Sequence, residues 1–319
     1  MAQPPSSTTG PAAIERLSPN RPVTVIGAGF VDVAVSVARL PESGGDQLAQ
    51  PRRTSAGGCG LNVARALARL GIEVVPGIPV GDGIWSDIVR SELRALGLDS
   101  PLQVTGADNG WCLAMVEPDG ERTFISIPGV ERQLTAERLA RVPQRDDSVL
   151  YVSGHELLGD SGADVRDWMS RRSWAACLVD IGPRLASVTP SLLRWLGERG
   201  AIVGCNREEA RALCGSDQFD AVDAFAERFG LTVIHRLGAA GARLCRPGQS
   251  ADLVAARPVA VVDTIGAGDA HSAGCLAALA CDWSLPGAVW LGNQVAAYSV
   301  AHQGADGTPE LQALRAFVC

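Results

Sequence analysis

The stretch AIVGCNREEARALCG, residues 201–215, runs from a short apolar segment directly into a helical pattern. The same order recurs along the chain from residue 22, where short apolar segments favour buried strands and the segments after them have one apolar helical face. Strands that alternate with helices are typical of a mostly parallel sheet with helices on both faces. We therefore predict an α/β fold for residues 22–319 and a disordered tail for residues 1–21. The other predicted strands lie in PVTVIGAGF (22–30), IEVVPGIPVG (72–81), SVLYVSG (148–154), ACLVDIG (176–182) and LTVIHRLG (231–238).

Two segments depart from this alternation, residues 33–56 and residues 107–128. The second contains WCLAMVEPDGERTFISI (111–127), whose PDG triplet predicts the turn of a β-hairpin. Alternating apolar and polar positions predict a small antiparallel sheet apart from the parallel one. Its place in the chain favours a lid across the mouth of the main domain, and an extension of the sheet edge is the alternative.

The composition is that of a globular protein, with 46% of the 319 residues hydrophobic and 20% charged. A net charge of −7 without a basic stripe argues against nucleic-acid binding. No apolar run reaches the length of about 18 residues that would predict a membrane span. The nine cysteines form no CxxC pair, which favours reduced thiols in a cytoplasmic protein.

All 28 basic residues are arginine, so the sequence contains no lysine. A Walker-type phosphate loop and Schiff-base chemistry both need lysine and are therefore excluded. Any phosphate group that the protein handles must be held by backbone amides, arginine or metal ions.

The stretch VVDTIGAGDAHSAG (261–274) predicts a strand, a small-residue turn and a helix. The backbone N–H groups of Ala267, Gly268 and Asp269 would then lie at a helix N-terminus, where unpaired amides and the helix dipole attract anions. A carboxylate beside that site suits a general base that removes a proton from a hydroxyl attacking a phosphoryl group. A simple helix cap is the structural alternative for Asp269.

Two other glycine-rich stretches lie at predicted strand or helix ends. SAGGCGLNVARAL (55–67) precedes and begins a helix whose polar face carries Arg65. Its glycines would admit a ligand whose hydroxyls bind Asn62, or they would serve tight packing with Asn62 as a cap. GAGFVD (27–32) has Asp32 where a dinucleotide-binding loop needs its third glycine. Asp32 is then either a ligand contact at a strand end or a turn residue.

Three further positions each allow two interpretations. Asn206 predicts a helix cap and Glu209 completes a capping-box pattern, or both side chains hold waters of a magnesium ion. RLGAAGARL (236–244) predicts a β-hairpin, or a cover for a flat ligand such as a nucleotide. Arg184, in DIGPR, binds a substrate carboxylate or phosphate, or it lies at the surface.

The motifs DTIGAGDA, AGGCGLNVARALARLG, NREE and LGAAG together resemble the signatures of the ribokinase-like (PfkB-type) carbohydrate kinases. They occur in family order, and the sequence is most similar to bacterial sugar kinases of unassigned substrate. The resemblance implies a three-layer α/β sandwich with a small β-sheet lid, and ATP and Mg²⁺ as cofactors. It implies transfer of the γ-phosphoryl group to a hydroxymethyl of a small-molecule sugar or nucleoside. A homodimer through the lid is compatible with the family.

The resemblance also gives roles to individual residues. The catalytic base is Asp269, and the anion hole is formed by Gly266, Ala267 and Gly268. The sugar is contacted by Asp32, Gly57, Gly58 and Asn62. The nucleotide side consists of Asn206, Glu209 (which also holds Mg²⁺ through water), Arg236, Gly238, Gly241 and Asn293. A monovalent cation such as K⁺ would lie near Asp263, Ile265, Ser299, His302, Gly304 and Thr308.

Three positions depart from the family pattern. Phe30 replaces a polar sugar contact of some members, Cys59 stands where ribokinases usually have lysine, and Arg236 replaces a common threonine. Arg236 therefore either reaches a phosphate or faces solvent. These differences put ribose in doubt as the substrate. A nucleoside kinase with Phe30 or Trp111 against the base is one alternative, and an inactive sugar-binding regulator is another.

Overall fold

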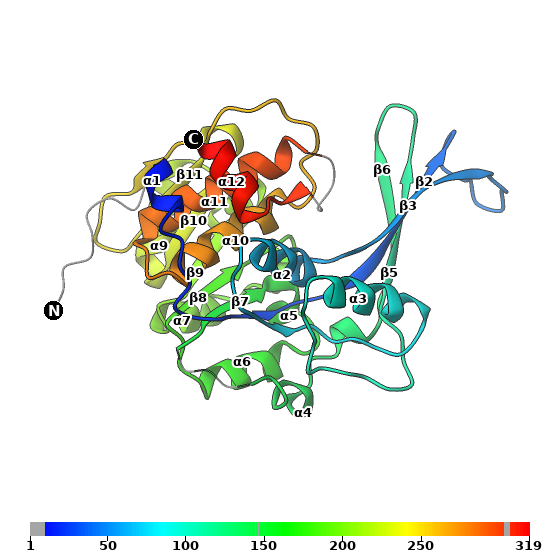
Figure 1. The fold of residues 1–319 in the computed structure, drawn as a ribbon, viewed down its shortest axis with the longest axis horizontal. Coiled ribbons are helices and arrows are strands. Elements are labelled where there is room, and N and C mark those ends of the chain that lie inside the picture. Colours follow the sequence, from blue (N-terminus) through cyan, green and yellow to red (C-terminus); the bar gives the residue numbers. More distant parts are fainter. Residues whose placement is uncertain (1–9, 144, 146, 303–306) are drawn as a thin grey trace.

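The structure is a computed structural model that describes residues 10–143, 145, 147–302 and 307–319. Within these residues the chain forms an eight-stranded sheet covered by helices and a separate four-stranded sheet (Figure 1). This arrangement confirms the predicted α/β fold with its small second sheet.

The larger sheet has the strand order β12-β11-β10-β9-β8-β7-β1-β4. Neighbouring strands from β10 to β4 are parallel, whereas β11 and β12 are antiparallel additions at one edge. The prediction of a mostly parallel sheet is therefore confirmed. Its strands are β1 (Val23–Ile26), β4 (Val74–Gly77), β7 (Val149–Ser153), β8 (Ala176–Asp180), β9 (Ile202–Cys205), β10 (Thr232–Arg236), β11 (Ala242–Cys245) and β12 (Asp252–Val254).

Successive side chains of these strands point into two apolar cores, one on each face of the sheet. In β7 and β8, Tyr151 and Leu178 pack into one core, whereas Val152 and Val179 pack into the other. The first core contains residues of α1 (Pro11–Ile14), α2 (Cys59–Arg69), α3 (Ile84–Ala95), α10 (Ala267–Leu279), α11 (Leu285–Val300) and α12 (Leu311–Val318). The second contains residues of α4 (Ala136–Leu139), α5 (Gly154–Leu158), α6 (Gly162–Ser170), α7 (Pro190–Glu198), α8 (Arg207–Cys214) and α9 (Phe219–Phe229). Short 3₁₀ helices are η1 (Val130–Arg132), η2 (Leu185–Ser187) and η3 (Gly238–Ala240).

The small sheet has the order β3-β2-β5-β6, formed by β3 (Ala49–Gly57), β2 (Phe30–Val37), β5 (Trp111–Val116) and β6 (Arg122–Ile127). The hairpin predicted for residues 111–127 is confirmed, because β5 and β6 pair antiparallel. The predicted small antiparallel sheet is confirmed for the pairs β2–β3 and β5–β6, whereas β2 and β5 pair parallel. These two strands are separated in the chain by β3, α2, β4 and α3, and such a crossover returns a strand in the same direction.

The N-terminal segment is ordered from residue 10 onward, which corrects part of the predicted tail. Ala13, Ile14 and Leu17 are 5%, 1% and 6% exposed and belong to the first core. Arg21 donates a hydrogen bond to Asp282, so the segment is also held by polar contacts. The apolar spacing within IERL explains this packing, because one face of a short helical turn suffices to bury it. Residues 1–9 of the predicted tail lie outside the described residues.

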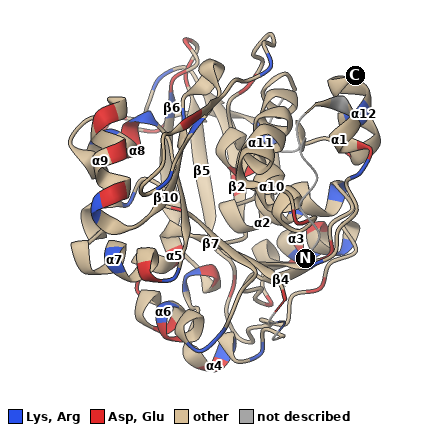
Figure 2. Ribbon diagram, turned by 90° about the vertical axis from the view of Figure 1, so that its left-hand side faces the viewer, with Lys and Arg blue, Asp and Glu red and all other residues tan. Residues whose placement is uncertain are grey.

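The ribbon in Figure 2 shows that positions of charged residues of both signs are interspersed along α6 to α9. This face therefore has the mixed charge of an ordinary solvent-exposed surface. Within the described part of the chain, none of the helices combines the length and apolar character needed to cross a membrane.

Candidate active site

The strands β1, β7, β8, β9 and β10 are parallel, so their carboxyl ends lie at one edge of the larger sheet. Open α/β sheets bind ligands at this edge. A cavity of about 410 Å³ lies there, between the small sheet, the N-terminal ends of α2 and α10, and the segment that follows β7. Among the residues predicted for catalysis and sugar binding, those that line it are Asp32, Gly58, Asn62, Gly266 and Asp269.

Helix α10 begins with the small-residue turn. Gly266 is its N-cap residue and has a φ of 72°, a left-handed conformation that glycine adopts without strain. No side chain caps this helix. The Ala267 N–H donates to the Thr264 carbonyl (3.2 Å), whereas the N–H groups of Gly268 and Asp269 have no acceptor among the described residues. Asp269 lies in the first turn, and its Oδ2 accepts a hydrogen bond of 2.8 Å from Asn62 Nδ2 on α2. The interpretation of Asp269 as a simple cap therefore does not fit.

Asp269 is half-buried at the wall of the cavity, and its pKa is raised from 3.8 to about 7. Burial is the largest cause and the charge of Asp180 adds to it, whereas the hydrogen bond from Asn62 and the charge of Arg236 oppose it. A carboxylate with a pKa near neutrality is well matched to accept and release a proton at physiological pH.

Arg65 lies behind Asn62 and fixes its orientation. The Arg65 side chain is 1% exposed; it donates to Asn62 Oδ1 (2.9 Å), Glu92 Oε1 (2.7 Å) and the Ala56 carbonyl (2.9 Å). A guanidinium only donates, so it holds the amide oxygen of Asn62 and leaves Nδ2 facing Asp269. The sequence placed Arg65 on a polar helix face and missed this role. The signal was its i,i+3 spacing from Asn62, which puts both on one side of α2.

Asp32 lies on β2, and burial raises its pKa from 3.8 to about 6 against the charges of Arg53 and Arg65. Gly57 does not line the cavity; it stands beside the Asp32 carboxylate, where a Cβ would overlap Oδ2. Gly58 lines the cavity and has a φ of 99°. Asp32 is thus a ligand contact candidate within a strand, and the interpretation as a turn residue is wrong.

Arg236, the last residue of β10, forms a two-pronged ion pair with Asp180, the last residue of β8. Its two terminal nitrogens lie 2.9 and 2.8 Å from the Asp180 oxygens, and one lies 3.4 Å from Glu209 Oε2. The side chain is 14% exposed, so the prediction that it faces solvent is wrong. A Cβ added at Gly268 would lie 3.7 Å from the guanidinium, which places Arg236 next to the α10 turn. The sequences of β8 and β10 gave no indication that Asp180 and Arg236 would form an ion pair.

The capping box at the start of α8 is confirmed. Asn206 Oδ1 accepts from the Glu209 backbone N–H (2.9 Å), and Glu209 Oε2 accepts from the Asn206 N–H (2.8 Å). Burial raises the pKa of Glu209, and Arg236 opposes that shift. Glu209 Oε1 makes no hydrogen bond within the described residues, so one carboxylate oxygen is left for another ligand.

The other nucleotide-side candidates lie around the β10–β11 connection. β10 and β11 pair antiparallel, which confirms the hairpin, and Gly238 and Gly241 take φ values of 64° and 97°. A Cβ on Gly241 would overlap the Val254 carbonyl, which itself accepts a hydrogen bond of 2.8 Å from Asn293 Nδ2. Gly241 and Asn293 therefore meet at Val254, outside the lining of the 410 Å³ cavity.

The cation candidates gather mainly at the end of α11. The Val300 carbonyl accepts from the Asp263 N–H (3.2 Å), and the His302 N–H donates to the Ser299 carbonyl (3.0 Å). The Ser299 hydroxyl is buried without a partner among the described residues. The remaining candidates are Ile265, which is exposed and lines the cavity, Thr308, which accepts from Arg69, and Gly304, which lies outside the described residues. No group of three His, Cys, Asp or Glu within the described ranges is arranged to hold a metal ion.

Residues that the sequence did not single out line the cavity after β7 and β6. His155 and Glu156 follow β7, and Arg132 ends η1. Arg184, for which a surface position was one interpretation, also lines the cavity and is half-buried. Their common signal is a position directly after a strand of the parallel or the small sheet. The departures Phe30 and Cys59 also line this cavity, as does Trp111.

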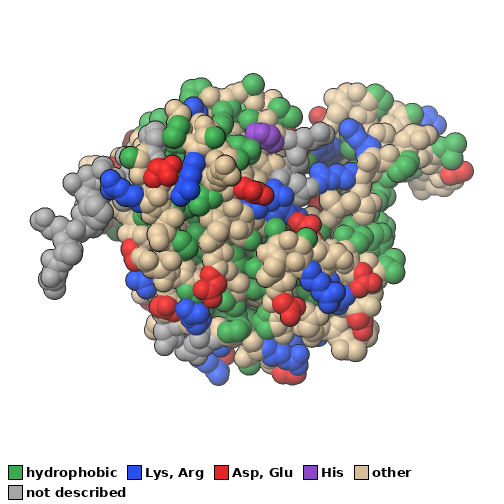
Figure 3. All heavy atoms as spheres, viewed as in Figure 1, with side chains coloured by type: hydrophobic (Ala, Val, Ile, Leu, Met, Phe, Trp, Pro, Cys, Tyr) green, Lys and Arg blue, Asp and Glu red, His purple; other side chains and the backbone are tan. Residues whose placement is uncertain are grey.

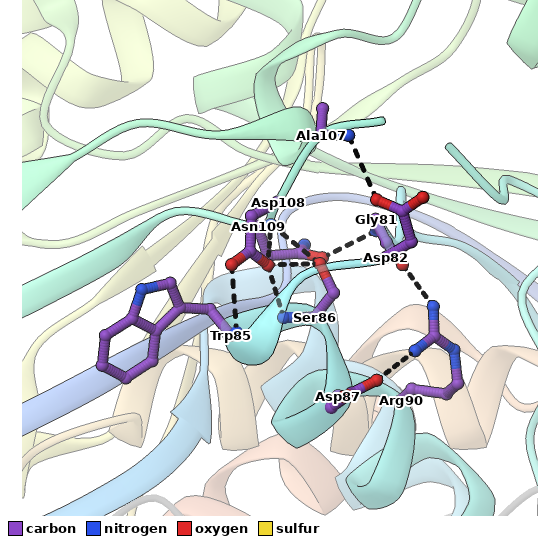
Figure 4. A network of polar contacts seen from close by, with 9 residues as sticks. All are labelled: Gly81, Asp82, Trp85, Ser86, Asp87, Arg90, Ala107, Asp108 and Asn109. Atoms are coloured by element: carbon purple, nitrogen blue, oxygen red, sulfur yellow. Dashed lines mark hydrogen bonds and ion pairs between the residues drawn. The ribbon is translucent and has the colours of Figure 1, made fainter. Parts of the chain in front are cut away.

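The small sheet is anchored at its root to α3. Asp108 accepts hydrogen bonds from the N–H groups of Trp85 (3.2 Å) and Ser86 (2.7 Å) and from the Ser86 hydroxyl (2.6 Å), as Figure 4 shows. Trp111, which begins β5, stacks on Trp85 with ring centroids 5.2 Å apart. These contacts fix the start of β5, whereas the far end of the sheet projects from the body (Figures 1 and 3).

Comparison with known proteins identifies the family. The profile of the pfkB family carbohydrate kinases matches residues 21–311. The chain is 37% identical to the uncharacterized sugar kinase YegV of Escherichia coli (strain K12), over 94% of this chain and 95% of that protein. It is 30% identical to the ATP-dependent ribose-1-phosphate kinase of Halopiger xanaduensis, over 93% and 98% of the two chains. The crystal structure of Thermotoga maritima ribokinase superposes with a TM-score of 0.78 over 93% of this chain and 99% of that one, at 22% identity. The protein therefore belongs to the pfkB family of carbohydrate kinases, which are phosphotransferases that act on sugar hydroxyls.

Proposed function

We propose that the protein is an ATP-dependent sugar kinase that transfers the γ-phosphoryl group to a hydroxymethyl group of its substrate. The observation that carries this proposal is the position of the Asp269 carboxyl group. It lies in the first turn of α10 and in the same cavity as Asp32 and Asn62. A base, an anion-binding helix end and hydroxyl-binding side chains are thus available in one place.

Asp269 removes the proton of the attacking hydroxyl. The hydrogen bond from Asn62 favours the ionised form of Asp269, and Arg65 keeps the amide turned the right way for it. The amides of Ala267, Gly268 and Asp269, with the turn at Gly266, stabilise the charge on the transferred group. In a chain without lysine these amides have a larger share of that task.

Asp32, Asn62 and the backbone at Gly57 and Gly58 bind and orient the sugar. Ionised Asp32 accepts hydrogen bonds from sugar hydroxyls, and exclusion of water by the small sheet strengthens these bonds. The small sheet would act as a lid that closes over the bound sugar, with its hinge at the anchored root near Trp111.

ATP supplies the phosphoryl group, and Mg²⁺ offsets the charge of its phosphates. The nucleotide side consists of Asn206, Glu209, Arg236, Gly238, Gly241 and Asn293. Glu209 fits a magnesium ion held through water, because its Oε1 is left unbonded by the capping box. A monovalent cation such as K⁺ fits beside the buried Ser299 hydroxyl and Asp263, near the end of α11.

An assay of ATP consumption with a panel of sugars, sugar acids, sugar phosphates and nucleosides tests the proposal. We expect turnover with one class of monosaccharide and a phosphorylated product that ³¹P NMR identifies as a primary phosphate ester. If no acceptor gives turnover above that of an Asp269→Asn variant, the proposal is wrong and a sugar-binding regulator is the better interpretation.

A nucleoside kinase is the second candidate. Phe30 and Trp111 line the cavity, and flat aromatic side chains can stack on a base. The same assay separates the two, because a nucleoside kinase would prefer a nucleoside over the free sugar.

Two broader expectations accompany the proposal. All nine cysteines are free, which supports a reducing compartment such as the cytoplasm.

A homodimer formed through the small sheet is supported by two exposed apolar side chains on the edge strand β6, Phe124 (57% exposed) and Ile125 (50% exposed). Measurement of the molecular mass in solution by sedimentation tests the dimer.

A further inference from the structure

Two arginines of the cavity come from segments far apart in the chain. Arg132 ends η1, which follows the small sheet, and Arg184 directly precedes η2, which follows β8. Both line the 410 Å³ cavity that also contains Asp269, and both are half-buried. The fold therefore brings two permanently charged side chains to one substrate-sized space.

Neither guanidinium has a partner in the described part of the chain: no ion pair and no side-chain hydrogen bond involves Arg132 or Arg184. The other arginines beside the cavity differ, because Arg65 binds Glu92 and Arg236 binds Asp180. A half-buried charge without a protein partner keeps only part of its hydration, so a ligand of opposite charge would stabilise it.

The two arginines act on the same neighbours. Burial lowers the pKa of His155, and the charges of Arg184 and Arg132 lower it further. Arg184 also opposes the rise in the pKa of Glu156 that burial causes, to about 7. By contrast, the charges that shift Asp269 are those of Asp180 and Arg236. The charges of the two arginines therefore act on His155 and Glu156, whereas neither is among the charges that shift the pKa of Asp269.

Five acidic residues also line the cavity, but within the described residues none of them forms an ion pair with Arg132 or Arg184. Glu131 accepts from the N–H groups of Gly110 (2.7 Å) and Gly129 (2.8 Å), so backbone amides already balance its charge. Asp160 also lines the cavity but is exposed to solvent. Glu156 is 7% exposed, and its Oε2 has no partner among the described residues. A buried acceptor without a partner points to a bound ligand that carries a donor.

From this geometry we infer that the acceptor is a monosaccharide with an anionic group, a phosphate or a carboxylate, bound by Arg132 and Arg184 while its hydroxymethyl faces Asp269. Guanidinium groups bind both anions through paired, charge-assisted hydrogen bonds. Glu156 accepts a hydrogen bond from a hydroxyl of the same sugar. The inference rests on the proposed function and names its substrate class.

The test compares matched acceptors: a neutral monosaccharide, the corresponding sugar acid and the corresponding sugar phosphate. We expect kcat/KM to be highest for one of the two anionic acceptors, and its identity distinguishes carboxylate from phosphate. Arg184→Met and Arg132→Met should each lower the ratio of kcat/KM for the anionic over the neutral acceptor about 10- to 100-fold. Arg184→Lys should retain part of the ratio. Arg171→Met, an exposed arginine on α6, is the matched control and should leave the ratio unchanged.

A preference for the neutral sugar, or an equal loss for both acceptors in the arginine variants, would overturn the inference. A measurement of binding that does not depend on turnover distinguishes failure of the anion site from failure of the proposed kinase activity. Calorimetric titration of the Asp269→Asn variant with the sugar acid and the sugar phosphate should show binding that Arg184→Met weakens. If that binding holds while no acceptor is phosphorylated, the kinase proposal is wrong and the anion site stands. If neither anion binds, the anion site is wrong whatever the turnover with neutral sugars.

Discussion

Two helices at the site begin with glycines, α2 at Gly58–Gly60 and α10 at Gly266–Gly268, but their glycines meet different surroundings. A Cβ on Gly60 would lie 2.5 Å from the Gly27 carbonyl carbon, so this glycine lets α2 pack against the turn after β1. A Cβ on Gly268 would meet only ordinary contact, 3.7 Å from the Arg236 guanidinium. The same sequence signal thus serves backbone packing in α2 and an accessible helix end in α10.

The difference teaches that a glycine-rich helix start predicts a ligand site only together with its neighbours. In α10 the neighbour is Asp269, a half-buried residue in the first turn, where the N–H groups of Gly268 and Asp269 have no acceptor among the described residues. In α2 it is Asn62, which holds that carboxyl group from the opposite side. One helix therefore supplies the chemical group and the other its support.

The largest effect is expected from Asp269→Asn. The variant should lower kcat by roughly 10²–10⁴, the range for loss of a general base, and leave ATP binding nearly intact. Steady-state kinetics and equilibrium binding of ATP measure the two quantities separately. Near-normal turnover would mean that Asp269 is not the base. The proposed difference between α10, which supplies the reacting group, and α2, which supports it, would then be wrong.

Alanine at Gly60 and at Gly268 tests the comparison directly. Gly60→Ala forces a Cβ against backbone, and we expect a loss of about 1–3 kcal/mol in the free energy of unfolding. Gly268→Ala has room for its Cβ and should leave stability within about 0.5 kcal/mol, because helix interiors also favour alanine. Its methyl group should instead weaken phosphoryl transfer by crowding the amides. Equal losses of stability in denaturant titrations of both variants would contradict the comparison.

The sequence predicted the parallel sheet well because each of its strands is a short apolar run ahead of an amphipathic helix. It predicted the turn and the helix at α10 because helix-end chemistry is local, but the strand predicted just before that turn is wrong, since residues 255–266 form no strand. It failed where partners are distant: Asp180 and Arg236 are 56 positions apart, and neither segment indicates the other. The parallel pairing of β2 with β5 was missed for the same reason, since pattern alone favours a hairpin neighbour. The contact between Arg65 and Asn62 could have been predicted, because the helix period places the two residues side by side.

The pH dependence of kcat/KM should distinguish the role of α2, which supports the Asp269 carboxyl group, from the role of α10, which carries it. With the pKa of Asp269 at about 7, kcat/KM should fall about tenfold per pH unit below that value. Arg65→Met removes the donor that fixes the Asn62 amide, so the amide can turn its oxygen toward Asp269. Because that would disfavour the carboxylate, we expect the acid limb of the profile to move to higher pH. An unmoved limb would leave Arg65 with a structural role alone.

The raised pKa also sets the sign of a stability effect. Ionising Asp269, which is partly removed from water, costs folding free energy, so its contribution is most favourable below pH 3.8 and is lost as the pH rises through about 7. Asp269→Asn should therefore raise Tm relative to the native protein at about pH 8, and the difference should shrink toward about pH 4. A lower Tm for the variant at the higher pH would contradict the assigned shift. This gain in stability would accompany the loss of activity in the same variant.

The smallest effect concerns Trp111, at the root of the projecting sheet. If the small sheet closes over bound sugar, the stack of Trp111 on Trp85 should change, and the intrinsic fluorescence should shift on saturation with the acceptor. Trp111→Phe should remove that part of the signal, whereas Trp195→Phe, on α7 of the opposite face, should retain it. An unchanged emission on saturation would mean that closure does not reach the root of β5. The contacts of Asp108 with α3 would then make the root a fixed anchor, and any movement would lie farther out along the sheet.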